Sequence, residues 1–161
     1  MALFVDTYVE VETANLYLSA SSVWLGATTP EKTSALIAAS QTFEDYSWLA
    51  SVVDPDQPMS WPRKTFSYYD KAKGTTIEVT AGTVPKRLER AVCNLALHFL
   101  TYPEALNQYN AKYTSISVGP ISLSAASAVD IKIPMVPSAV KSLVLPFLEE
   151  GSGGYLWWRA N

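Results

Sequence analysis

The feature that most restricts the fold is one strongly amphipathic segment in the middle of the chain. Between residues 85 and 101, apolar residues recur at steps of three and four: Leu88, Ala91, Val92, Leu95, Ala96 and Phe99. This spacing places them on one face of a helix. Pro85 suits a first helical turn, because the N–H that proline lacks has no partner there. We therefore expect a helix over about residues 85–101 that buries one face.

Two further helices are expected on either side of this segment. Thr28-Thr29-Pro30-Glu31 combines a capping threonine, an early proline and an early glutamate, so a helix starts here and its apolar face continues to about residue 50. A last helix is expected over residues 138–148, with Ser138 as its cap. Pro146 lies inside that pattern and should kink or end the helix.

The other segments predict short or irregular elements. Residues 1–18 indicate extended chain, and a short helix follows over residues 19–25, ended by glycine. Residues 51–83 form a long loop containing one strand over about residues 75–80. Apolar and polar residues alternate on both sides of a Gly-Pro pair in residues 116–123, which indicates two short strands or one kinked strand.

These elements predict a mainly α protein: a small bundle of three to four helices with a short β-hairpin, extended loops and an extended C-terminal tail. A length of 161 residues suits one domain. We expect that domain over residues 1–150, with the long loop 51–83. A flexible Gly-Ser joint and an aromatic tail follow over residues 151–161.

The composition favours burial against other chains. Apolar residues make up 48% and charged residues only 17%, below the roughly 25% of an average soluble domain. The surplus apolar surface suggests contacts with neighbouring proteins. A net charge of −3 and a pI of about 5.1 argue against electrostatic binding of nucleic acid by the whole molecule.

Cysteine usage and the absence of long apolar runs restrict the compartment. A single cysteine excludes an internal disulfide, and no apolar run reaches the length of a transmembrane helix. The N-terminus lacks the basic region of a signal peptide. We expect a product of a reducing cytoplasm without a membrane contact.

Few residues suit catalysis. His98 is the only histidine and Cys93 the only cysteine, and both lie in the segment 85–101. We interpret both as structural and expect no catalytic residues, no metal and no cofactor. A small hydrolase built on these two residues is the remaining enzymatic alternative.

One loop segment, residues 61–73, mixes cations with aromatic rings. Such a mixture is typical of a platform that stacks single-stranded nucleic acid, but it also describes a loop that packs on a neighbouring subunit. We favour the subunit interface. The basic residues are Arg63, Lys64, Lys71 and Lys73, and the aromatic residues are Trp61, Phe66, Tyr68 and Tyr69.

The C-terminal tail is the second unusual segment. Two adjacent tryptophans follow the glycine-rich joint, so the tail either adds an edge strand to its own domain or inserts into a partner. We favour the partner, and the residues concerned are Tyr155, Leu156, Trp157, Trp158 and Arg159.

Five segments in the same order resemble a known family. They are Ala14–Ser19, Met59–Arg63, Val84–Ala96, Ser117–Ser122 and Gly151–Gly154. Together they resemble the head–tail adaptor (connector) proteins of tailed bacteriophages, a family that includes members catalogued as putative DnaT-like single-stranded-DNA-binding proteins.

The resemblance implies a structural virion protein at the head–tail junction, assembled in the host cytoplasm. It implies a homo-oligomeric ring, commonly a dodecamer, that docks under the portal protein and binds a tail, nozzle or stopper protein. Double-stranded DNA would pass through this ring without sequence readout during ejection.

We combine the resemblance with the residue patterns to assign the contacts. The tail residues 155–159 would bind the portal or tail protein. The expected subunit interface consists of Trp61, Arg63, Phe66, Tyr68, Tyr69, Val118 and Ile121. The alternative is a DnaT-like accessory protein that binds single-stranded DNA through Trp61, Arg63, Lys64, Tyr68 and Tyr69.

Overall fold

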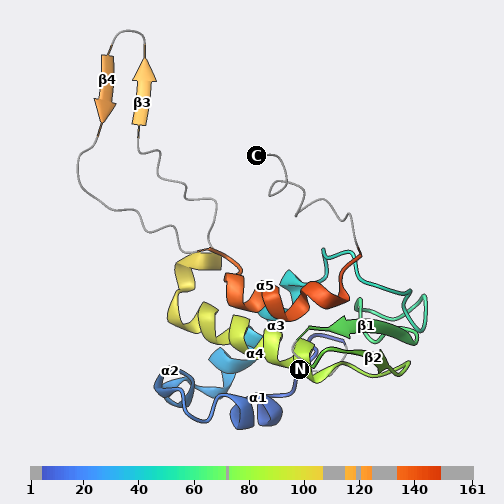
Figure 1. Ribbon diagram of the computed structural model, residues 1–161. Helices are drawn as coiled ribbons and strands as arrows, with labels where there is room; N and C mark the ends of the chain where they lie inside the picture. The colour runs from blue at the N-terminus through green and yellow to red at the C-terminus, as the bar shows by residue number, and fades with distance from the viewer. Residues whose placement is uncertain (1–4, 72, 107–114, 119–120, 125–133, 150–161) are drawn as a thin grey trace.

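The computed structural model describes residues 5–71, 73–106, 115–118, 121–124 and 134–149. Figure 1 shows a helical body with a small hairpin at one side and a second hairpin standing away from it. The elements in chain order are α1 (Val11–Tyr17), α2 (Ser22–Gly26), α3 (Thr29–Thr42), β1 (Phe66–Asp70), β2 (Thr75–Val79), α4 (Lys86–Thr101), η1 (Pro103–Leu106), β3 (Ser115–Val118), β4 (Ile121–Ser124), α5 (Ser138–Val144) and η2 (Leu145–Phe147).

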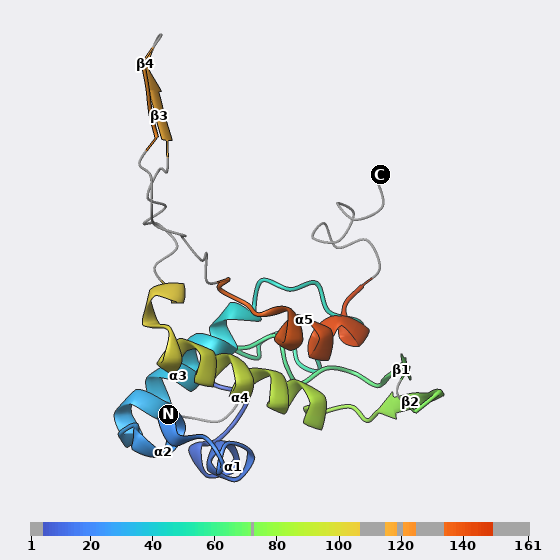
Figure 2. The same ribbon diagram turned by 60° about the vertical axis from the view of Figure 1, so that its left-hand side comes forward.

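Helix α4 is the centre of the body, and the helix predicted over residues 85–101 is confirmed. It packs against α1, α2, α3, α5 and η1. Figures 1 and 2 show α3 along it and α5 beside it. Its buried residues are Leu88, Ala91, Val92, Cys93, Leu95, Ala96 and Phe99, which include the whole predicted apolar face.

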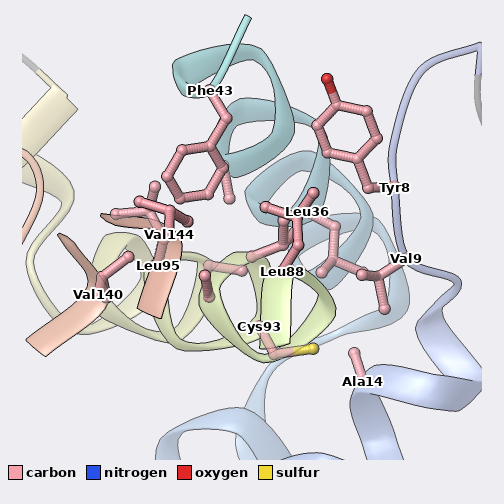
Figure 3. Packing of buried hydrophobic residues seen from close by; sticks show 14 of the residues in the cluster. Tyr8, Val9, Ala14, Leu36, Phe43, Leu88, Cys93, Leu95, Val140 and Val144 are labelled. Atoms are coloured by element: carbon pink, nitrogen blue, oxygen red, sulfur yellow. The ribbon is translucent and has the colours of Figure 1, made fainter. Parts of the chain in front are cut away.

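The core joins distant parts of the sequence around this helix. In Figure 3, Leu36 of α3 and Val9 of the N-terminal segment lie toward one end of α4, and Val144 of α5 lies toward its other end. All three side chains are buried. A fully buried aliphatic side chain contributes roughly 1.5–3 kcal/mol relative to an exposed one. The packing on α4 therefore dominates the stability of the body.

Helix α3 begins as the sequence predicts. The Thr28 side chain accepts a hydrogen bond from the Glu31 N–H, and the Thr28 N–H donates to Glu31 Oε2 at 2.7 Å, which completes a capping box. Hydrogen bonds from Thr28 lower the pKa of Glu31. The helix ends at Thr42 rather than near residue 50, because the chain turns after Phe43 and buries Trp48 in the core.

The prediction of a mainly helical bundle is wrong, because the structure is a small mixed α/β protein with two antiparallel hairpins. Strand β2 occupies the predicted strand position, but its partner β1 was not predicted. The two strands pair with Phe66 opposite Val79 and Asp70 opposite Thr75. The inner face of β1 packs on the end of the chain, where the Tyr68 and Phe147 ring centroids are 4.7 Å apart.

Two smaller predictions are corrected near the ends of the chain. Residues 1–18 are not extended throughout, because Val11–Tyr17 form α1, whose first residue is buried in the core. Ser138 does not cap α5; the capping position is Pro137, and no side chain bonds the helix start there.

Other sequence expectations lie outside the described residues. These are the Gly-Ser joint and the aromatic tail over residues 151–161. In the part of the chain that the structure describes, no helix has the length and hydropathy needed to span a bilayer.

The central position of α4 gives a direct test of the core. Leu95→Ala should lower the free energy of unfolding by about 2–5 kcal/mol, because Leu95 is fully buried and the change leaves a cavity. Leu145→Ala is the matched control, since Leu145 is 46% exposed and should lose less than about 1 kcal/mol. Urea denaturation followed by circular dichroism measures both. Equal losses would show that α4 does not organise the core.

Candidate functional site

The mixed basic and aromatic segment 61–73 is mostly turned into its own chain. Trp61 has no exposed surface and lies in an aromatic cluster. Its ring centroid is 5.5 Å from that of Trp48, 5.9 Å from that of Phe66 and 6.2 Å from that of Phe147. A side chain buried in this way offers no surface to a nucleic-acid base or to a partner.

Arg63 also serves its own fold. Its Nη1 donates to Ser60 O at 2.7 Å, and its Nη2 donates to Ala50 O at 2.7 Å. Its Nε donates to the carbonyl oxygens of Leu49 and Ala50, each at 3.0 Å. Burial lowers the pKa of Arg63, and the negative charges of Glu149 and Glu44 oppose that change.

The Arg63 bonds stabilise a strained turn of the backbone. Ala50 has a φ of 61°, which is unfavourable for a residue with a Cβ atom. The adjoining backbone is paired with the end of the chain, since the Leu49 N–H donates to Phe147 O at 2.8 Å and the Glu149 N–H donates to Ser47 O at 3.0 Å. Arg63 therefore holds the turn against which residues 147–149 are fixed.

Glu44 supports the same region from α3's end. It accepts a hydrogen bond from the Tyr8 hydroxyl, and its Oε2 accepts from the Ser60 N–H at 2.8 Å and the Ser60 hydroxyl at 2.9 Å. The Met59–Arg63 segment is thus fixed by hydrogen bonds at both of its ends. In this fold, the Met59–Arg63 motif therefore connects parts of the same chain through hydrogen bonds.

The part of segment 61–73 that remains exposed is small. Phe66 and Tyr68 are half-buried against the core, and burial raises the pKa of Tyr68, with the Asp70 carboxylate adding to the rise. Tyr69 is 57% exposed. The exposed basic and aromatic residues among those described in this segment are Lys64, Tyr69, Lys71 and Lys73. One exposed ring in this segment does not form the row of stacked aromatics that the single-stranded-DNA alternative requires.

An open groove of about 630 Å³ lies between the β1–β2 hairpin and the start of α4. Basic side chains line it, but two of them, Arg87 and Lys86, contact acidic groups of the same chain. Arg87 lies 3.7 Å from Asp70 Oδ2, and its Nε donates to Leu143 O at 3.0 Å. Lys86 Nζ lies 3.6 Å from Glu89 Oε2. The groove was not predicted from the sequence, because it also needs the unpredicted strand β1 and the distant Leu143 of α5.

The second hairpin, β3–β4, differs from every other described element in its position. Both views show it away from the helical body, and its strands pair with each other (Figures 1 and 2). The register pairs Ile116 with Leu123 and Val118 with Ile121, and serine positions pair with serine positions. Because alternate positions of a strand lie on opposite faces, the four apolar positions share one face of the ladder.

His98 and Cys93 occupy structural positions. Cys93 is buried and its sulfur points into the core near Ala14 (Figure 3). Burial raises the pKa of the Cys93 thiol to about 12, with the Glu89 charge contributing. His98 Nε2 lies 2.8 Å from Pro134 O, at the start of the segment that leads to α5. A thiol that stays protonated is a poor nucleophile, so this pair does not suit catalysis.

Metal ligands are not gathered either. Within residues 5–71, 73–106, 115–118, 121–124 and 134–149, no group of three or more histidine, cysteine, aspartate or glutamate side chains is placed to hold a metal ion.

Taken together, the described residues form a small mixed α/β protein with a basic groove beside α4 and a second hairpin away from the body. The model of one protein family, described as "Putative DnaT-like ssDNA binding protein", matches residues 4–160. The chain belongs to this family. Searches of curated proteins and of solved structures found no match.

The role of Arg63 is tested by substitution. Arg63→Ala should lower the free energy of unfolding by about 2–3 kcal/mol, because the carbonyl oxygens of the turn lose charged donors. Arg63→Lys should recover less than half of that loss, since one ammonium cannot replace the guanidinium fork.

Lys64→Ala is the matched control, because Lys64 is the exposed neighbouring cation and its loss should change stability by less than about 0.5 kcal/mol. Urea denaturation measures all three variants. A stable Arg63→Ala variant that loses only DNA binding would assign Arg63 to a nucleic-acid site instead.

Proposed function

We propose that this chain is a non-enzymatic structural subunit that acts by binding, as a head–tail adaptor of a tailed-phage particle. The observation that carries the proposal is the β3–β4 hairpin, which lies apart from the body and has all its apolar positions on one face. An isolated two-stranded hairpin is at best marginally stable in water. A hairpin of this kind gains stability when another protein covers its apolar face.

The proposal includes assembly into a closed ring. One contact repeated between identical subunits generates a ring when the rotation closes, and each subunit is then held by two neighbours. In the proposed particle the ring binds the portal on one side and a tail or stopper protein on the other. The net charge of −3 suits a channel through which DNA must slide, because an attractive wall would retain it.

Fewer residues are proposed for the subunit interface than the sequence suggested. Val118 and Ile121 lie at paired positions of the hairpin, and Tyr69 is exposed on β1, so these three remain interface residues in the proposal. Trp61 and Arg63 support the interface indirectly by shaping their loop. The tail residues 155–159 are proposed to dock on the portal or tail protein.

Substitution on the apolar face of the hairpin tests the ring. Val118→Asp combined with Ile121→Asp should abolish self-association, because a buried interface does not accept unpaired carboxylates. Ser117→Asp combined with Ser122→Asp is the matched control, since this pair occupies the other face of the same ladder. Sedimentation velocity measures the oligomers. If only the serine variant loses association, the contact lies on the serine face of the ladder, and the proposal is wrong.

Single-stranded DNA binding is the second candidate, and the family description supports it more directly than it supports an adaptor. Its contacts would be the exposed Lys64, Tyr69, Lys71 and Lys73. Against it stand the burial of Trp61 and the bonding of Arg63 to the backbone, which remove two of the five residues that this alternative assigns to DNA binding.

Titration with labelled oligo-dT separates the two candidates. The adaptor proposal predicts no salt-sensitive binding at micromolar protein, because the exposed remainder has one ring and three cations. Fluorescence anisotropy at two salt concentrations measures it. Tight binding that weakens steeply with salt, and that Lys64→Ala with Lys71→Ala and Lys73→Ala abolishes, would establish the second candidate instead.

A further inference from the structure

The groove between the β1–β2 hairpin and the start of α4 has more positive than negative charge. Among the described residues, four basic and two acidic residues line it. Two of the basic residues, Arg87 and Lys86, already contact acidic side chains. The other two, Lys73 and Arg90, form no ion pair with a described residue. We call this hollow the basic groove.

The basic groove also has an apolar wall. Val84, Pro85 and Leu143 line it, and each is only half-buried. Its volume of about 630 Å³ lies in the range of roughly 300–1,000 Å³ that holds small ligands, so it suits the tip of a loop rather than a whole helix. A matching occupant combines carboxylates, which the cations attract, with small apolar groups that cover the wall.

An exposed loop of the same chain, residues 53–56, has this chemistry. Its sequence is Val-Asp-Pro-Asp, and all four residues are exposed, Val53 by 41%. Neither Asp54 nor Asp56 forms an ion pair with a described residue. We call residues 53–56 the acidic loop. Because no ion pair joins this loop to the basic groove within one chain, both are available to another copy.

The acidic loop has a defined shape. The Asp56 N–H donates to Asp54 Oδ1 at 3.0 Å, and the Asp54 N–H donates to Gln57 Oε1 at 3.2 Å. Gln57 Nε2 in turn donates to Pro62 O at 3.0 Å, which anchors the base of the loop. A loop that is already ordered loses little conformational freedom when it binds.

We propose that the acidic loop of one copy docks in the basic groove of the next copy. The two carboxylates of the loop meet Lys73 and Arg90, while Val53 and Pro55 cover the apolar wall. Because the loop and the groove are different surfaces, the contact is heterologous and continues from copy to copy until a ring closes. This inference rests on the proposed ring and names one contact within it.

Charge reversal on either side tests the contact. The groove variant carries Lys73→Glu and Arg90→Glu. The loop variant carries Asp54→Asn and Asp56→Lys, in which the asparagine keeps the Oδ1 acceptor of the loop. Each variant alone should associate at least about tenfold more weakly than the wild type, because like charges then face each other.

A one-to-one mixture of the two variants should restore association to within about threefold of the wild type. In the mixture, the groove of each variant meets a loop of opposite charge on the other variant. Sedimentation velocity with the variants labelled by different fluorophores measures the mixed oligomers. Loss of folding does not produce such a rescue, and circular dichroism checks each variant. If the groove variant does not fold, Lys73→Glu replaces it, since Lys73 is exposed in the turn between β1 and β2.

Two control variants change charge outside the contact. Lys64→Glu with Lys71→Glu matches the groove variant, because both lysines are exposed and neither lines the groove. Glu10→Gln with Glu12→Lys matches the loop variant at another exposed acidic pair. Both controls should associate like the wild type. A loss in a control as large as in its matched variant would show a general effect of charge and overturn the inference.

The remaining outcomes separate the inference from the proposed function. Groove and loop variants that associate as the wild type does would overturn the inference and leave the adaptor proposal standing. Rescue in the mixture with a wild type that stops at dimers would support the contact and contradict the ring. A groove variant that loses only oligo-dT binding would assign the groove to nucleic acid and overturn the inference. A wild type that stays monomeric at the highest soluble concentration would contradict the ring and the inference together.

Discussion

The burial of α4 is the constraint on which the rest of the structure depends. Its apolar face and the flanking small residues receive α3, α5 and the two short N-terminal helices. Two of these helices, α1 and α5, have no side-chain cap at their starts. Their stability comes from packing rather than from local propensity. The body is consequently one cooperative unit.

The segment with the strongest binding signal in the sequence proves to be part of the scaffold. Trp61 fills the centre of an aromatic cluster, and Arg63 holds the carbonyl oxygens of the turn at Ala50. Tryptophan and arginine are common in binding sites, but here Trp61 and Arg63 contact residues of their own chain. The described residues still leave the basic groove beside α4 and the separate hairpin β3–β4 open to other molecules.

How much the sequence predicts depends on whether a signal is local. The capping box at Thr28 and the spacing from Leu88 to Phe99 act within a few turns, and both are confirmed. Helix α1 and strand β1 lack such signals. Strand β1 forms because Tyr68 meets Phe147, which is distant in the sequence. Trp61 is likewise buried by residues distant in the sequence, such as Phe147. Composition and spacing therefore cannot show whether its ring faces the core or the solvent.

Negative-stain electron microscopy of the purified wild-type protein, without DNA, tests the central claim that this chain works by assembling with itself. The account predicts closed rings of uniform diameter at concentrations where the Val118→Asp, Ile121→Asp variant gives only single particles. A wild type that shows single particles throughout, and that binds single-stranded oligonucleotides tightly, would contradict the account.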